Sequence, residues 1–503
     1  MAMNIKQAKE EIRNTLTAYL AKDELGNYQI PSLRQRPVLL MGPPGIGKTQ
    51  IMAQIAAETG VGLVSYTITH HTRQSAVGLP FIEHRTYDGE SVATTEYTMS
   101  EILASVYNLM EKTGVKEGIL FLDEINCVSE TLAPMMLQFL QCKTFGNRAM
   151  PEGWLICAAG NPPEYNRSVR DFDVVTLDRV KRIDVEEDFS VWKEYAISKG
   201  LHGAVISYLD IKKDNFYRIE NTVDGLRFAT ARGWEDLSEL IFAYEKLGIR
   251  VTREVVEQYI QMPQIAKDFA SYLELYYKYQ TTYRVGDILE GVFEPVTVSA
   301  LRRAPFDEKL SVMGLLYARL AESARKTRAA DELAEDVFVD LKAFQAGSTD
   351  LTALAEGRAA RMKAARDAGH LDRPAQLRMQ REIAALESFL KVLEEADAAE
   401  LAASDRAAAV DLIRPHFQSI TDAREAAADA TGAKFDNVFR YLEEAFGQGQ
   451  ELVIFVTEIT AGTDTSWFVE NFGCDAYYRH NRELLFNDTR RKIEEEVRGI
   501  HAE

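Results

Sequence analysis

A glycine-rich segment near the start of the chain, GPPGIGKT at residues 42–49, limits the folds that are open to this sequence. The segment fits the pattern GxxxxGK[ST]. It follows an apolar run at residues 36–41, which predicts a buried strand, and it precedes the helical pattern QIMAQIAAETG, which ends at Gly60. A strand, a glycine loop and a helix in this order predict a parallel α/β domain with a phosphate-binding loop.

The residue types in this loop suit a nucleoside triphosphate. Glycines let backbone N–H groups converge on phosphate oxygens, and the new helix adds its positive end. Lys48 can reach the β- and γ-phosphates, and the hydroxyl of Thr49 can bind Mg²⁺. The alternative, a glycine turn with a surface lysine, leaves the flanking strand and helix unexplained. We expect nucleotide contacts from Gly42, Pro43, Pro44, Gly45, Ile46, Gly47, Lys48, Thr49 and Gln50.

A second apolar run, GILFLDE at residues 118–124, ends in two carboxylates. It predicts a central parallel strand whose carboxyl end opens on the active-site edge of the sheet. Asp123 suits the Mg²⁺ shell, and Glu124 suits a general base for an attacking water. Taken alone, the two carboxylates would be expected to cap the next helix. Beside a phosphate-binding loop they fit the same reaction as the loop.

A third apolar run, WLICAA at residues 154–159, is followed by Gly160-Asn161-Pro162-Pro163. We expect Asn161 at the tip of the strand beside the one that bears Asp123. There its amide could hydrogen-bond both water and the γ-phosphate. An Asn before Pro is more often a turn residue, so this assignment depends on its neighbours.

Together these segments resemble an AAA+ ATPase, and in detail the MoxR branch of that family. GPPGIGKT is similar to the family's Walker A motif, ILFLDE to its Walker B motif and AAGNPPEYN to its sensor 1 segment. The resemblance covers about residues 1–310 well and the remainder only loosely. It implies ATP hydrolysis with ATP and Mg²⁺ as ligands.

The resemblance also assigns roles to two arginines. TLDRV at residues 176–180 resembles the LDRF-like arginine-finger segment, so Arg179 is expected to reach the γ-phosphate of a neighbouring subunit. TARGW at residues 230–234 resembles the TPRxW sensor 2 segment, so Arg232 is expected to contact phosphate from the lid. Val180 stands where Phe is usual and Ala231 where Pro is usual. The alternative for Arg179 is a surface ion pair with Asp173, Asp178 or Asp184.

Two hairpins are expected within the first domain. One lies near residues 80–97 around an Asp-Gly turn, and a smaller one lies near residues 145–153. Their positions match the helix-2 and pre-sensor-1 insertions of the MoxR branch, which point toward the central channel in the rings of such families. The alternative is two surface hairpins without a role.

Two further signals are weaker. Gln29-Ile30-Pro31 precedes the first strand, and Ile30 could line the adenine pocket as the N-terminal linker does in AAA+ proteins. Entry of these apolar residues into a core is the alternative. His70 and His71 are adjacent and lack an evident third ligand, which favours polar loop residues over a metal site.

The expected fold class is α/β, with a P-loop AAA+ core at residues 1–187, in which a parallel sheet is flanked by helices and residues 181–185 form the last strand. An all-α lid is expected at residues 188–315, and a mainly helical domain for partner contact at residues 316–503. Alanine-rich composition between about 320 and 433 predicts long antiparallel helices with a break in AGSTDLTAL. Residues 452–456 fit a strand or a helix, with helix favoured, and residues 481–500 predict an amphipathic helix.

Charge and the resemblance together set the functional expectation. The chain has 58 basic and 77 acidic residues, a net charge of −19, which argues against duplex nucleic acid as the main partner. No apolar run of membrane-spanning length and no secretory signal is evident, so the cytoplasm is the expected compartment. We expect a Mg²⁺-dependent ATPase that forms a homo-oligomeric, hexameric ring and remodels a protein client. The resemblance implies a partner with a von Willebrand factor A domain. The alternatives are a nucleic-acid-linked AAA+ motor or loader, and a scaffold in which nucleotide binding is only a switch.

Overall fold

The computed structural model describes residues 2–70, 78–87, 90–145, 148–165, 172, 174–222, 225–367, 373–396 and 405–482. The chain divides into two compact units. Unit 1 consists of Met1–Lys193 and Lys212–Lys267, and unit 2 consists of Glu194–Ile211 and Asp268–Glu503. The division into domains at 1–187, 188–315 and 316–503 stays a prediction.

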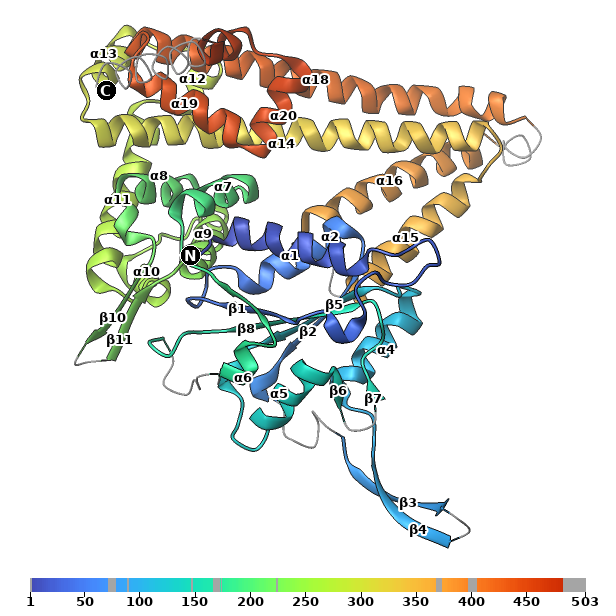
Figure 1. Ribbon diagram of the computed structural model, residues 1–503. Coiled ribbons are helices and arrows are strands. Elements are labelled where there is room, and N and C mark those ends of the chain that lie inside the picture. The colour runs from blue at the N-terminus through green and yellow to red at the C-terminus, as the bar shows by residue number, and fades with distance from the viewer. Residues whose placement is uncertain are drawn as a thin grey trace, which may run out of the picture. The chain divides into compact units, whose positions relative to one another are not determined.

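A five-stranded parallel sheet forms the centre of unit 1, in the order β2-β5-β8-β1-β9 (Figure 1). All of β8 is buried, and so is β5 except for its last residue, as expected for strands covered on both faces. Met41 at the end of β1 lies opposite Gly160 and Asp184. The predicted fold class is confirmed. The strands are β1 (Val38–Met41), β2 (Gly62–Thr67), β5 (Gly118–Asp123), β8 (Trp154–Gly160) and β9 (Lys181–Asp184).

Helices cover both faces of this sheet because successive strand residues point to opposite sides. Leu40 and Phe121 pack with residues of α1 (Ile5–Leu20) and α2 (Lys48–Thr59). Leu39 and Leu122 pack on the other face with residues of α4 (Glu101–Thr113) and α5 (Ala133–Cys142). Each apolar run in the sequence therefore contributes to two cores.

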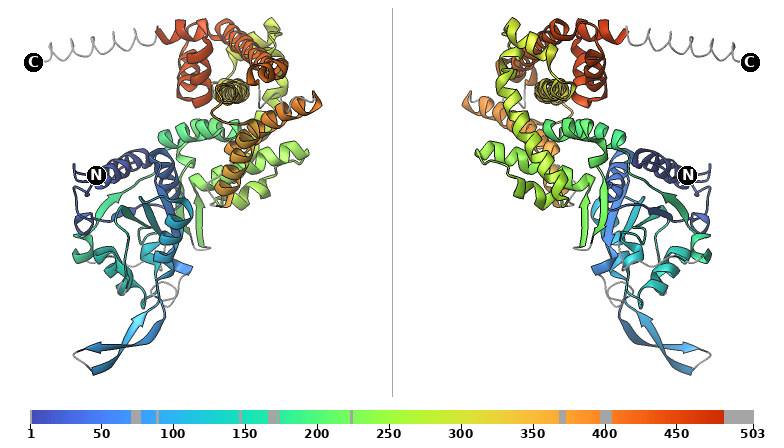
Figure 2. Two further views of the ribbon diagram at one scale, coloured as in Figure 1. Left: turned by 90° about the vertical axis from the view of Figure 1, so that its right-hand side faces the viewer. Right: turned by 90° about the vertical axis from the view of Figure 1, so that its left-hand side faces the viewer.

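The described part of unit 1 contains three two-stranded antiparallel sheets besides the main sheet. Two are the predicted hairpins, and Figures 1 and 2 show the longer one, β3–β4, extending away from the sheet. The third lies in the segment expected to be an all-α lid, which is otherwise mainly helical. The strands are β3 (Pro80–Tyr87), β4 (Glu90–Tyr97), β6 (Thr144–Phe145), β7 (Arg148–Ala149), β10 (Arg218–Thr222) and β11 (Gly225–Ala229).

The lid-like part of unit 1 is organised around the start of α9 (Ala231–Leu247). Thr230 caps this helix by accepting a hydrogen bond from the backbone N–H of Gly233 at 3.2 Å. Trp234 is fully buried, and its indole N–H donates to the carbonyl of Phe216 at 3.1 Å. The remaining helices that lie wholly or partly in unit 1 are η1 (Ser32–Arg34), η2 (Ile68–His70), η3 (Ile125–Cys127), α6 (Val174–Leu177), α7 (Phe189–Lys199), η4 (Lys213–Asn215), α10 (Arg253–Tyr259) and α11 (Pro263–Thr282).

Unit 2 is helical throughout its described part. Its two longest helices, α14 (Phe306–Gln345) and α18 (Arg406–Phe446), run antiparallel and side by side, as the alanine-rich composition predicts (Figure 1). The predicted break falls between α14 and α15, and residues 452–456 lie in a helix, as favoured. Most of the predicted helix at 481–500 lies outside the described residues. The other helices are α8 (Gly203–Ile211), α12 (Val285–Leu289), α13 (Pro295–Arg303), α15 (Leu351–Asp367), α16 (Arg373–Glu395), α19 (Gln450–Ala461) and α20 (Thr463–Phe472).

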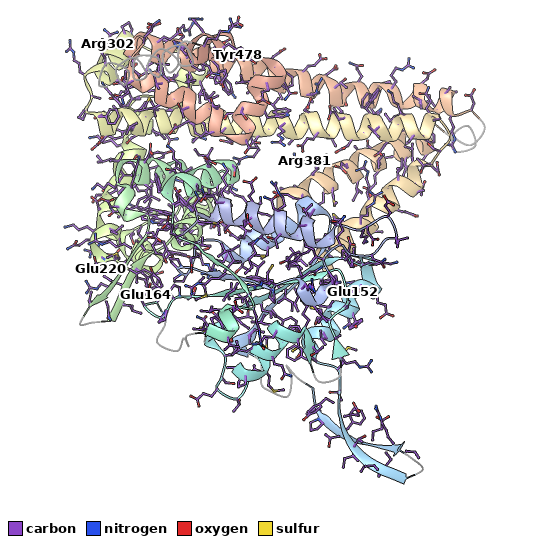
Figure 3. All side chains as sticks on the ribbon, viewed as in Figure 1. Glu152, Glu164, Glu220, Arg302, Arg381 and Tyr478 are labelled. Atoms are coloured by element: carbon purple, nitrogen blue, oxygen red, sulfur yellow. The ribbon has the colours of Figure 1, made fainter. Side chains whose placement is uncertain are left out.

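Polar contacts link the helices of unit 2. Arg302 at the end of α13 donates to the carbonyls of Glu444 and Ala445 at the end of α18 (Figure 3). Arg358 pairs with the buried carboxylates of Asp340, at 2.6 Å, and Glu382. Among the described residues, no helix is long and apolar enough to cross a membrane, and no group of three or more His, Cys, Asp or Glu residues is arranged to hold a metal ion. His71 of the adjacent histidine pair lies outside the described residues.

Candidate functional site

The phosphate-binding loop has a backbone that requires glycine at three positions. Gly45 and Gly47 have φ angles of +75° and +95°, which side-chain-bearing residues rarely adopt. A Cβ at Gly42 would lie 2.6 Å from the carbonyl oxygen of Val185, so the backbone directly after β9 leaves no room for a side chain there. Gly47 gives no side-chain cap to α2, which leaves N–H groups of the first helical turn for an anion.

Lys48 points into this loop and is only 7% exposed. Its ammonium donates to the carbonyls of Gly42 and Pro43, both at 2.7 Å, and to Oδ1 of Asn161 at 2.9 Å. Burial lowers the Lys48 pKa to about 8, opposed by the negative charge of the Asp123 carboxylate. The predicted phosphate-binding lysine therefore meets the predicted sensor asparagine in one site.

A second cluster brings the end of β5 to the start of α2. The Thr49 hydroxyl donates to Oδ2 of Asp123 at 2.8 Å, and Oδ1 of Asp123 accepts the backbone N–H of Glu124 at 2.9 Å. One hydroxyl and one carboxylate side by side are the oxygen ligands that Mg²⁺ prefers, so these residues fit the ion that the sequence implies.

Glu124 leaves the strand in an unusual conformation. Its φ of 56° lies in the left-handed region, which directs the residue out of the line of β5. Its Oε2 accepts a hydrogen bond from the hydroxyl of Thr69, which lies in η2 after β2, at 2.9 Å. Sequence reasoning missed Thr69, because a single threonine beyond a strand carries no pattern.

Asn161 lies directly beyond β8 and is held by a second asparagine that the sequence analysis also missed. Nδ2 of Asn126 donates to the carbonyl of Asn161 at 2.8 Å, and Oδ1 of Asn126 accepts the backbone N–H of Asn161 at 3.3 Å. Asn126 is 2% exposed. Its only sequence signal was its position two residues after Glu124.

Arg232 and Tyr217 reach the other side of the loop. A Cβ built on Gly45 would lie 3.5 Å from Cβ of Arg232, so the first turn of α9 starts beside the glycine loop. The Tyr217 hydroxyl donates to the carbonyl of Pro44 at 2.8 Å, and burial raises its pKa well above the usual range. Arg232 was predicted at this site and Tyr217 was not.

Arg179 does not converge with these residues. It is exposed in the turn before β9, and its guanidinium donates to Oε1 of Gln141 in α5. β9 begins at Lys181, which lies opposite Val38 at the amino end of β1, whereas the glycine loop follows the carboxyl end. Strands rise about 3.3 Å per residue, so roughly 10 Å of β1 separates the two edges. Arg179 forms no ion pair with the described carboxylates of Asp178 or Asp184.

Ile30 is not brought to the glycine loop either. Its carbonyl accepts a hydrogen bond from Gln35 at 2.9 Å, and nearby Tyr28 donates to Glu117, directly before β5, at 2.9 Å. This segment therefore lies at the amino edge of the sheet.

Residues 3–5 lie close to the loop instead. Met3 N–H donates to the carbonyl of Asp184 at 2.8 Å, and Cγ1 of Ile5 lies 4.0 Å from a Cβ built on Gly47. Gln50 is exposed on the first turn of α2, where its Oε1 lies 3.5 Å from the same built Cβ. No sequence pattern singled out residues 3–5.

Comparison with known proteins gives a family match to part of this chain. No curated protein matches the chain. A solved structure from Cytophaga hutchinsonii, described as a candidate ATPase, has 17% identity and a TM-score of 0.23 over 35% of this chain and 46% of that chain, so the match spans less than half of that protein. Residues 38–176 match the family described as ATPase family associated with various cellular activities (AAA). Residues 38–176 are therefore similar to an AAA ATPase domain, and this range contains Lys48, Asp123 and Asn161.

Proposed function

We propose that this protein is a ring-forming, Mg²⁺-dependent ATPase of MoxR type that uses ATP hydrolysis to remodel or activate a protein client. The observation that carries the assembly part is the position of Arg179. It is exposed at the amino edge of the sheet, whereas Lys48 and the glycine loop lie at the carboxyl edge. A second copy of the chain could present Arg179 to a γ-phosphate that its own subunit cannot offer.

Within one subunit, different residues bind the phosphates and the Mg²⁺ ion of ATP. Lys48 exchanges its carbonyl acceptors for phosphate oxygens, and the free N–H groups at the start of α2 bind the same phosphates. Thr49 and Asp123 would hold Mg²⁺, which neutralises charge on the β- and γ-phosphates when it is bound. Arg232 adds a positive charge from the first turn of α9, as the resemblance to sensor 2 implies.

The attacking water requires a base and an orienting group. Glu124 is the base in this proposal, with its carboxylate oriented by the Thr69 hydroxyl. Asn161 presents an amide next to Lys48 and can hydrogen-bond both water and the γ-phosphate. The water proton passes to Glu124 as oxygen attacks phosphorus, and ADP leaves with the former bridging oxygen.

The surfaces that would meet a client lie outside this site. The β3–β4 ribbon carries Phe81 and Ile82 at 47% and 72% exposure, and an isolated two-stranded ribbon gains stability from a partner. Its place in the chain resembles the helix-2 insertion, which supports contact with a client in the channel of a hexameric ring. A von Willebrand factor A domain partner, contact of residues 316–503 with that partner and a cytoplasmic location belong to the same proposal and come from the MoxR resemblance.

A mixing experiment tests the assembled site. Arg179→Ala and Glu124→Gln subunits are each expected to be inactive alone. In mixed rings, Arg179→Ala subunits keep their base and receive Arg179 from Glu124→Gln neighbours, so about one site in four should be active after random mixing. Arg182→Ala, which removes an exposed arginine paired with Asp184 at 2.8 Å, is the matched control and should keep full activity.

Two results would contradict the proposal. If mixed Arg179→Ala and Glu124→Gln subunits stay inactive while both still bind ATP, Arg179 does not act in trans. If ATP hydrolysis per subunit is constant on dilution to a proven monomer, no assembly is needed. Stimulation by duplex DNA, with binding that weakens steeply as salt rises, would favour the nucleic-acid-linked alternative despite the net charge of −19.

A further inference from the structure

The ends of strands β5 and β8 are linked by a side chain where their backbone pairing stops. The parallel ladder between them ends at Leu122 and Ala158. β8 continues to Gly160, so the backbone of Asn161 lies beyond the last pair. Beyond the ladder, the side-chain amide of Asn126 makes the hydrogen bonds that a paired strand would make to Asn161. It donates to the carbonyl of Asn161 at 2.8 Å and accepts the N–H of Asn161 at 3.3 Å.

The position of Asn126 is fixed by burial and by close packing against Gly160. It is 2% exposed and lies in η3, which is anchored by Ile125 at 1% exposure in the core. A Cβ at Gly160 would lie 2.6 Å from Oδ1 of Asn126, so the close approach depends on glycine. Because a buried amide pairs both of its polar ends with one residue, its hydrogen bonds define the orientation of that residue.

The orientation matters because Asn161 is in contact with Lys48. Oδ1 of Asn161 accepts the Lys48 ammonium at 2.9 Å. We propose that Asn126 is a positioning residue for ATP hydrolysis, which fixes the backbone of Asn161 so that its amide lies beside Lys48 and the attacking water. The inference rests on the proposed role of Asn161. In this role Asn126 acts through Asn161, because both polar ends of its amide bond the Asn161 backbone.

Steady-state kinetics of a double-mutant cycle test this role. We expect Asn126→Ala to lower kcat by about 10- to 100-fold, because small misplacements of catalytic groups have effects of this size. KM for ATP should change little, since the phosphate-binding loop is intact. In the Asn161→Ala background, Asn126→Ala should cause almost no further loss, because no amide is left to position.

A structural role gives different results. If Asn126→Ala lowers kcat by the same factor with and without the Asn161 side chain, or if kcat does not fall at all, the positioning role is wrong. Thr15→Val, which removes a buried hydroxyl bonded to the carbonyl of Glu11 at 2.7 Å, is a control that should alter stability without changing kcat.

Two milder variants keep the test decisive if Asn126→Ala fails to fold. Gly160→Ala displaces Asn126 without removing a polar group and should lower kcat, with KM retained. Asn126→Asp keeps the acceptor and loses the donor, so its kcat should also fall. Full kcat in both folded variants overturns the inference.

The Asn161→Ala variant separates this inference from the proposed function. If Asn161→Ala retains full kcat, the proposed role of Asn161 is wrong. If Asn161→Ala is slow and the Asn126 variants have normal kcat, only the role of Asn126 is wrong.

Discussion

Lys143 is buried with no counter-charge among the described residues, and its removal should stabilise the protein. It lies between α5 and β6 at 5% exposure, and its ammonium has no hydrogen-bond partner among the described residues. Burial lowers its pKa from 10.5 to about 8. We expect Lys143→Met, which keeps the volume of the side chain and removes the charge, to raise the free energy of unfolding near neutral pH.

The size and the pH dependence follow from the pKa. A fall from 10.5 to about 8 corresponds to roughly 3 kcal/mol, because one pH unit is about 1.36 kcal/mol. Between these pH values the unfolded chain binds a proton that the folded chain does not, so the stability of the wild type rises with pH. The advantage of Lys143→Met should be about 1–3 kcal/mol near pH 7 and about 1 kcal/mol smaller near pH 9.

Urea unfolding followed by tryptophan fluorescence at the two pH values measures this difference. Lys112→Met in α4, where the lysine is exposed, is the control and should change stability by less than about 0.5 kcal/mol at both pH values. If Lys143→Met lowers the stability near pH 7, or if its advantage is the same at both pH values, the ammonium is not held uncompensated in the core.

Three further changes test the site. Glu124→Gln should abolish ATP turnover and leave binding of a fluorescent ATP analogue intact; undiminished hydrolysis would remove Glu124 from the mechanism. Gly42→Ala should prevent nucleotide binding and lower stability by about 1–3 kcal/mol, because its Cβ would lie 2.6 Å from the carbonyl of Val185; calorimetric titration that shows normal ATP affinity would contradict this. Tyr217→Phe removes the hydrogen bond to Pro44 and should lower the melting temperature by an amount equivalent to about 1 kcal/mol, and an unchanged melting temperature would show that this bond contributes nothing.

Local patterns were enough to predict the phosphate-binding loop and the strands β1, β5, β8 and β9, whereas β2 was not predicted. β1, β5 and β8 are apolar runs, and Gly42–Gly47 lies directly between β1 and α2. The same holds for both predicted hairpins. The β10–β11 hairpin was missed although its sequence contains the Asp-Gly pair 224–225, because the helical patterns around it dominated the interpretation.

Contacts between distant segments could not be predicted in this way. Three hydrogen bonds of the site join residues that are far apart in the sequence. They are Thr69 with Glu124, Asn126 with Asn161, and Tyr217 with Pro44. A single polar side chain leaves no periodic signal, so only folding shows which backbone group it meets. Ile30 was expected near the nucleotide, but its segment lies at the amino edge of the sheet. The sequence shows how many residues separate Ile30 from β1, but it does not show which edge of the sheet Ile30 approaches.

The amino-acid sequence by itself determined the chemistry of this protein, because a glycine loop, a lysine, a hydroxyl and a carboxylate pair act through groups that adjoin their own strands and helices. The tertiary structure decided which of these groups meet and which do not. Parallel pairing of β1 and β9 places Arg179 at the edge of the sheet opposite Lys48. The β5–β8 ladder ends at Leu122 and Ala158, so the backbone of Asn161 is free to pair with the side chain of Asn126. Both follow from strand register, which depends on the packing of the whole sheet.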